Sequence, residues 1–215
     1  MSQDEIRAER PAPTTIAEAI GGPLGMAETA LPGVAFVVAY TVTGSNTNTA
    51  AIVAVGLALV LTVARLIRRE SPRHALSGLF GVAFAAFIAT STNKAENYYL
   101  PGLLTNAAMV TGLVISILVR WPLIGVIVAN LDGEDSTWRD DPVRARVFRQ
   151  ATWFWAALFS ARLVVQLPLY LAGAVVALGV ARTAMGLPLF VLGLWLTWLM
   201  VRGARAPAAP PAAQA

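Results

Sequence analysis

Apolar runs of nearly membrane-spanning length alternate with short polar turns along most of the chain. A transmembrane helix needs roughly 20 predominantly apolar residues. Six stretches meet or approach that length: Ala27–Thr43, Thr49–Ile67, Ala75–Thr92, Tyr98–Val119, the apolar part of 141–171 and Met185–Val201. The first is short and contains Pro32 and Gly33, so we expect it to be kinked or tilted. The pattern predicts an all-α fold, a polytopic transmembrane helical bundle of about six helices.

Capping and breaking residues locate several of the helix ends. Asp141 followed by Pro142 predicts an N-cap with proline at the first helical position, well before the apolar part of that helix. The run 121–131 is too short to cross a bilayer, so we interpret it as an interfacial or re-entrant helix. After residue 171 the apolar chain is interrupted by Arg182 and Gly186, and we place the outer turn there. Small residues at Ser77, Gly81, Ala85 and Ala89 indicate that the third helix is centrally packed.

The two ends of the chain differ from the apolar middle. Thr15 and Glu18 have the spacing of a capping box and predict a short helix through Ile20, which the glycines and proline at 21–25 would end. We divide the chain into a cytoplasmic N-terminal tail (1–25), a transmembrane helical domain (26–202) and a disordered Ala/Pro-rich tail (203–215). The first twenty residues lack the basic start and apolar middle of a signal peptide, so we expect insertion through the first internal span.

Positive charges are distributed unevenly between the two sides that six spans define. With six spans the termini share a side, and only Lys94 and Arg182 fall opposite to it. The residues on the shared side are Arg7, Arg10, Arg65, Arg68, Arg69, Arg73, Arg120, Arg139, Arg144, Arg146, Arg149, Arg202 and Arg205. Because Lys and Arg are retained in the cytoplasm, the sequence predicts a multi-pass protein of the inner (plasma) membrane with both termini cytoplasmic.

Composition narrows the chemistry that the chain can perform. It is 57% hydrophobic and 13% charged, and it has no cysteine, so disulfides, zinc-thiolate sites and thiol nucleophiles are excluded. His74 is the only histidine, and no P-loop, G-x-S-x-G or H-E-x-x-H motif occurs. The net charge of +4 comes from arginines between apolar runs, which does not indicate a nucleic-acid partner. We therefore expect no enzyme, no catalytic residue, no cofactor and no metal site.

A single arginine, Arg162, lies near the middle of an apolar span. A guanidinium in hydrocarbon costs about 2.5 kcal/mol or more unless it faces protein or water. Gln166 lies four residues on, on the same helical face, and Asn106 falls at a similar depth, with Tyr40 nearer the outer surface. One hypothesis is a polar pocket, built by these four residues, that holds an anionic head group or solute. The other is that Arg162 has a structural role, bonded to helix-end carbonyls and Asn106.

Several strings of residues carry a resemblance to known families. They include LPGVAFVVAY from Leu31, NYYLPGLLTNA from Asn97, RWPLIG from Arg120 and WAALFSARLVVQLPLYLAG from Trp155. In these the chain resembles an uncharacterised actinobacterial family of polytopic membrane proteins, known as a domain of unknown function. More distantly it is similar to the intracellular septation protein A family, through PLI at Pro122 and Trp138, Trp155, Phe159 and Gln166; Arg162 and the Ala/Pro tail depart from that family.

The second resemblance implies a small inner-membrane protein that supports envelope synthesis and division through contacts with other envelope proteins. We therefore expect a non-enzymatic cell-envelope or division-associated factor whose partners are the lipid bilayer and envelope or division membrane proteins, with a homo-oligomer left open. The alternative is a small channel or transporter subunit with an anion-binding polar pocket around Arg162. Neither family supplies catalytic residues to carry over.

Overall fold

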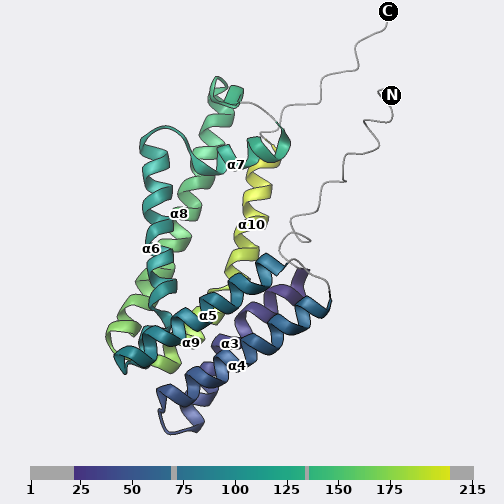
Figure 1. The fold of residues 1–215 in the computed structure, drawn as a ribbon. Coiled ribbons are helices and arrows are strands. Elements are labelled where there is room, and N and C mark those ends of the chain that lie inside the picture. The colour runs from purple at the N-terminus through teal and green to yellow at the C-terminus, as the bar shows by residue number, and fades with distance from the viewer. Residues whose placement is uncertain (1–21, 69–71, 134–135, 204–215) are drawn as a thin grey trace, which may run out of the picture. The chain divides into compact units, whose positions relative to one another are not determined.

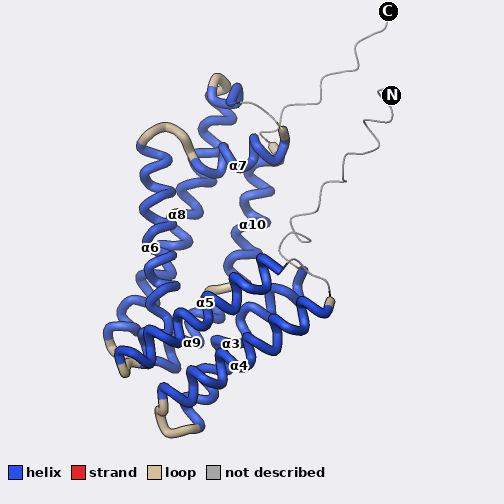
Figure 2. Tube along the Cα trace, viewed as in Figure 1, coloured by secondary structure: helices blue, strands red, loops and turns tan. Residues whose placement is uncertain are grey.

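All the regular structure in the described part of the chain is helical. The computed structural model describes residues 22–68, 72–133 and 136–203, and no strand occurs among them (Figure 2). This confirms the predicted all-α fold class. The helix expected from Thr15 to Ile20, most of the N-terminal tail and nearly all of the Ala/Pro-rich tail lie outside the described residues.

Five helical stretches of the described chain are long and apolar enough to cross a membrane. They are Thr47–Ile67, Ala75–Thr92, Ala95–Leu118, Pro142–Leu171 and Val175–Arg202, and a shorter apolar helical stretch covers Ala30–Val42. The protein is therefore a multi-pass membrane protein with a helical bundle architecture, as its apolar pattern predicts.

The chain divides into two compact units, and the first contains three helices. These are α3 (Gly22–Val42), α4 (Thr47–Ile67) and α5 (Pro72–Thr92), and α4 packs against both others (Figure 1). Helix α4 buries a face of small residues, which lets neighbouring backbones approach closely: Ala50, Ala51, Ala54, Ala58 and Thr62. Of the predicted small-residue stripe on α5, Ala85 and Ala89 are buried while Ser77 and Gly81 are exposed.

The first predicted span begins earlier than expected. Helix α3 begins at Gly22 rather than at Ala27 and continues through Pro23 and Gly25, whereas the end predicted for the preceding short helix lies outside the described residues. Pro23 falls in the first turn, where a backbone N–H has no partner in the helix anyway, so its missing donor costs little there. Pro32 also lies inside α3, as prolines in transmembrane helices often do.

The second unit, residues 95–215, is organised around one long helix. Helix α8 (Pro142–Leu171) contacts α6 (Leu100–Leu118), α7 (Leu123–Asp132), α9 (Val175–Ala184) and α10 (Leu187–Arg202), and two short 3-10 helices, η1 (Ala95–Tyr99) and η2 (Ser136–Arg139), pack beside it. The predicted N-cap is confirmed, since the Asp141 carboxylate accepts from the backbone N–H groups of the next turn, the nearer being Val143 N at 2.8 Å. The predicted short helix over 121–131 is confirmed as α7.

The segment after α8 differs from its prediction. The apolar stretch in which we placed the outer turn forms helix α9, and Arg182 lies in its last turn. The turn that leaves α8 is shorter, at Ala172–Ala174, and a second break at Met185 and Gly186 separates α9 from α10. The predicted sixth span, Met185–Val201, therefore corresponds to α10, and the segment before it, in which a turn was expected, is helical.

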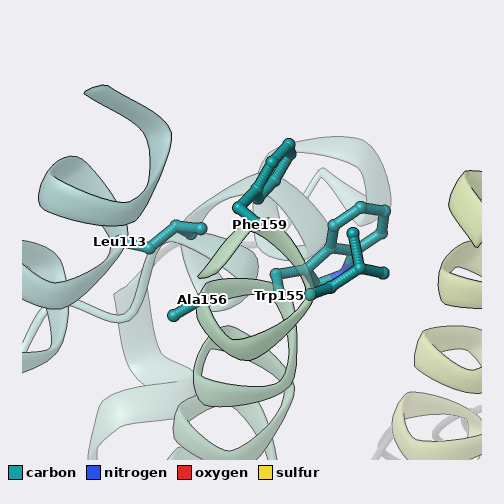
Figure 3. Close-up of a cluster of buried hydrophobic side chains, with 5 residues drawn as sticks. Leu113, Trp155, Ala156 and Phe159 are labelled. Atoms are coloured by element: carbon teal, nitrogen blue, oxygen red, sulfur yellow. The ribbon is translucent and has the colours of Figure 1, made fainter. Parts of the chain in front are cut away.

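Aromatic and aliphatic side chains from α6, α8 and α10 form the core of the second unit. Leu113 of α6 packs with Trp155, Ala156 and Phe159 of α8 (Figure 3). The indole Nε1 of Trp155 donates to Thr197 Oγ1 of α10 at 2.8 Å, and a Cβ on Gly193 would lie 3.2 Å from the same indole. The absence of a side chain at Gly193 thus lets α10 approach α8 at this level.

Candidate intramembrane polar site

The pairing of α6 with α8 places Asn106 at the level of Arg162. The two helices are antiparallel, and toward the C-terminal end of α6 Leu113 lies in one cluster with Ala156 of α8. At the other end the Tyr170 hydroxyl donates to Asn97 Oδ1 at 2.6 Å. Between these two contacts the same register puts Asn106 opposite Arg162, which agrees with the depth that the sequence predicts for both.

Arg162 is held by contacts at the break between α9 and α10. Its Nη2 donates to the carbonyl oxygen of Gly186 at 2.6 Å, and its guanidinium lies 5.7 Å from the centroid of the Phe159 ring. Its Nε is buried without a hydrogen-bond partner. The carbonyl contact is of the kind that a structural role requires, whereas the buried Nε is a donor left without a partner.

Gln166 and Asn106 are buried polar groups on the two facing helices. Gln166 is 2% exposed, and its Oε1 is buried without a hydrogen-bond partner. Asn106 is 8% exposed. No hydrogen bond joins Arg162, Gln166 and Asn106 to one another in the described structure. Asn106 lies at the level of Arg162 and Gln166 lies about one turn further along α8, but the three residues do not bond to each other.

Tyr40, the fourth residue predicted for the pocket, belongs to α3 in the first unit. Its ring stacks on Phe36, with centroids 6.3 Å apart and planes 9° from parallel. The second unit therefore holds three of the four predicted residues, and Tyr40 is packed within the other unit.

Arg182 belongs to the polar site of the second unit, although the sequence predicted that it lies in an outer turn. Its guanidinium lies directly against Gly102 of α6, at the position that a Cβ would occupy, and 5.8 Å from the centroid of the Tyr99 ring. The sequence signal for this contact is Gly102. A glycine leaves space on the helix surface, and the Arg182 guanidinium packs into that space.

Comparison with known proteins assigns the chain at the level of a family. A model of the family described as "Protein of unknown function (DUF3159)" matches residues 20–208. The chain belongs to this family. No curated protein and no solved structure matches it.

The match covers nearly all of the chain, so the polar residues of this DUF3159 protein lie within the family's region of similarity. Within the described residues, no group of three or more His, Cys, Asp or Glu is placed to hold a metal ion. None of the described carboxylates forms an ion pair with Arg162 or Arg182.

Proposed function

We propose that this DUF3159 protein is a non-enzymatic factor of the cell envelope or of cell division, acting in the plasma membrane through contacts with lipid and with other membrane proteins. The observation that carries the proposal is the small share of its apolar helices that packs inside the protein. In the most apolar window of Val175–Arg202 only 11% is buried, and α10 buries only Gly193 and Val201. The remaining apolar faces are surfaces for lipid and for transmembrane partners.

The positions of arginines on the helices support an orientation with both termini in the cytoplasm. Arg65 lies in the last turn of α4 and Arg202 in the last turn of α10, while Arg120 follows the end of α6. Arg146 and Arg149 lie in the first turns of α8. If each long helix crosses once, these ends meet the same membrane surface, and the positive-inside rule makes that surface cytoplasmic.

Two measurements test this proposal. Reporter fusions of alkaline phosphatase and green fluorescent protein at each end should show fluorescence without phosphatase activity, because both ends lie in the cytoplasm. Cross-linking in intact cells, followed by purification of the full chain, should recover membrane proteins of division or wall synthesis, and a deletion strain should change in shape or in sensitivity to wall-active antibiotics. Normal morphology and sensitivity, with no such partner recovered, would exclude the envelope role.

A second function, an anion-binding site around Arg162, is favoured by a separate observation. Arg162 Nε and Gln166 Oε1 are buried without partners, and Arg182 adds a second positive charge nearby. A bound carboxylate or phosphate could accept from both guanidiniums, which relieves their repulsion. Anion flux through proteoliposomes, or stabilisation of the purified protein by an anion, should depend on Arg162; equal behaviour of Arg162→Met and wild type excludes this function.

A further inference from the structure

A second basic site lies at the opposite end of the second unit from Tyr170 and Asn97. A cavity of about 540 Å³ opens where the α6–α7 turn, η2 and the start of α8 meet. Its lining residues are Ile117, Arg120, Pro122, Thr137, Trp138, Arg139, Asp140, Ala145 and Arg149. Three guanidiniums and one carboxylate line it, so the described lining carries two positive charges in excess. None of the residues predicted for the intramembrane pocket contributes to it.

The wall of this cavity is a packed structure. Trp138 is 2% exposed and meets Phe148 of α8 edge to face, with ring centroids 5.1 Å apart. Helix α7 approaches the same indole at Gly125, where an added Cβ would lie 2.9 Å from Trp138 Cη2. Because an aromatic pair and a close helix approach fix this wall, the neighbouring arginines project from rigid elements.

The three guanidiniums of the cavity are available for a ligand. Arg139 lies over the Trp121 ring, with its Cζ 4.1 Å from the centroid, and a guanidinium stacked in this way keeps its N–H donors free in its own plane. No hydrogen bond or ion pair of the Arg120, Arg139 or Arg149 guanidinium to another residue occurs in the described parts of the chain. Asp140, the one acidic lining residue, is therefore not engaged with any of them.

Arg120 occupies a backbone position that normally suits glycine. Its φ is 60°, and it ends α6 in a Schellman turn, with Trp121 N bonded to Ser116 O at 2.8 Å and its own N to Ile117 O at 3.0 Å. The same pair of bonds ends α8 at Gly173. Glycine adopts this left-handed conformation without steric cost, whereas the Cβ of arginine makes the conformation unfavourable. Because Arg120 is kept in an unfavourable backbone conformation and lines a cavity, we infer that its side chain has a function there.

We propose that this cavity binds the phosphate group of an anionic phospholipid head group. Guanidiniums match phosphate oxygens in a bidentate geometry, and basic pockets between transmembrane helices on the cytoplasmic side bind phospholipid head groups. The short helix α7 beside the cavity exposes Ile127 and Leu131, and Trp121 is 44% exposed, as expected of an interfacial element. The assignment to the inner leaflet rests on the proposed orientation, whereas the binding itself does not.

The test measures lipid-dependent stabilisation of the full-length purified protein in detergent. Wild type, Arg120→Gly, Arg149→Gln and Arg146→Gln are titrated with dioctanoyl phosphatidylglycerol, and with dioctanoylglycerol, which lacks phosphate. Arg146 is an exposed arginine of α8 outside the cavity, so its variant controls for net charge. Glycine removes the unfavourable backbone conformation at position 120, so Arg120→Gly should be at least as stable as wild type without lipid. A loss of lipid binding in this variant would therefore not result from unfolding.

We expect phosphatidylglycerol, but not dioctanoylglycerol, to raise the thermal midpoint of wild type and Arg146→Gln alike. Arg120→Gly and Arg149→Gln should need about tenfold more lipid, as expected from the loss of one charge-assisted contact. If inorganic phosphate alone gives the same shift with the same dependence on Arg120, the phosphate site stands and its source is free phosphate. Equal responses of all four proteins, or an equal loss in Arg146→Gln, overturn the proposal. These outcomes do not depend on whether a division partner is found.

Discussion

Replacing Arg162 with methionine separates a structural role from a binding role, because the contacts of this arginine can be summed. Its bond to Gly186 O is an interhelical hydrogen bond, worth about 0.6–1.7 kcal/mol in a membrane protein. Its position over Phe159 adds about 0.5–1 kcal/mol. Against these, a cation in the apolar region costs about 2.5–3.5 kcal/mol. The two contacts together supply about 1–3 kcal/mol, which does not exceed the cost of the charge, so we expect Arg162→Met to lose no more than about 1 kcal/mol of unfolding free energy.

The unfolding free energy is measured by titrating the protein in dodecyl maltoside micelles with sodium dodecyl sulfate, using tryptophan fluorescence as the signal. Arg162→Lys is the matched control, since it keeps the charge but loses the planar donor geometry. In the same samples, any stabilisation by added anions should disappear in Arg162→Met and be weakened in Arg162→Lys. A loss of about 3 kcal/mol or more in Arg162→Met would refute the reasoning and assign Arg162 to the structural role.

Three further substitutions test the packing of the second unit by the same unfolding titration. Trp155→Phe removes the bond to Thr197 and leaves space beside it, so we expect a loss of about 1–2 kcal/mol, while Trp153→Phe on the exposed face should be neutral. Asp141→Ala removes the cap of α8 and should cost about 1 kcal/mol. Gly186→Ala would place a Cβ 2.9 Å from a backbone carbonyl oxygen of α9, and should cost about 1–3 kcal/mol. If the unfolding free energy of one of these variants equals that of wild type, the contact removed or altered by that substitution does not stabilise the fold as we expect.

The parts of the fold that could be predicted from the sequence are those encoded by neighbouring residues. Apolar length predicts the long helices, and the Asp141–Pro142 pair predicts where α8 begins, because a cap is a contact within one turn. The break between α9 and α10 was harder to locate, since both helices are apolar and Gly186 is the only strong signal between them. Hydrophobicity alone does not separate one long crossing helix from two shorter helices.

The polar site could be predicted only in part, for a different physical reason. The spacing of Arg162 and Gln166 is a property of one helix, and the sequence shows it directly. The acceptor of Arg162 is a backbone carbonyl oxygen. Every residue carries this group, so the amino-acid sequence does not indicate which one accepts the hydrogen bond. Arg182 reaches the site through its contact with Gly102, which is far away along the chain, and the packing of α9 against η1 brings the two together.

In the second unit, large side chains are accommodated where a neighbouring element carries glycine. In three places an added Cβ would meet a bulky or charged side chain at or below ordinary contact distance: Gly102 with Arg182, Gly125 with Trp138, and Gly193 with Trp155. In lipid there is little hydrophobic driving force between helices, so association depends on close packing and on polar contacts. For helix association around a guanidinium or an indole, a glycine on the neighbouring helix is therefore more important than additional apolar contact area. A methyl group at position 102 or 125 would therefore require the Arg182 guanidinium or the Trp138 indole to shift, and one at position 193 would require Leu158 or Trp155 to give by a few tenths of an ångström.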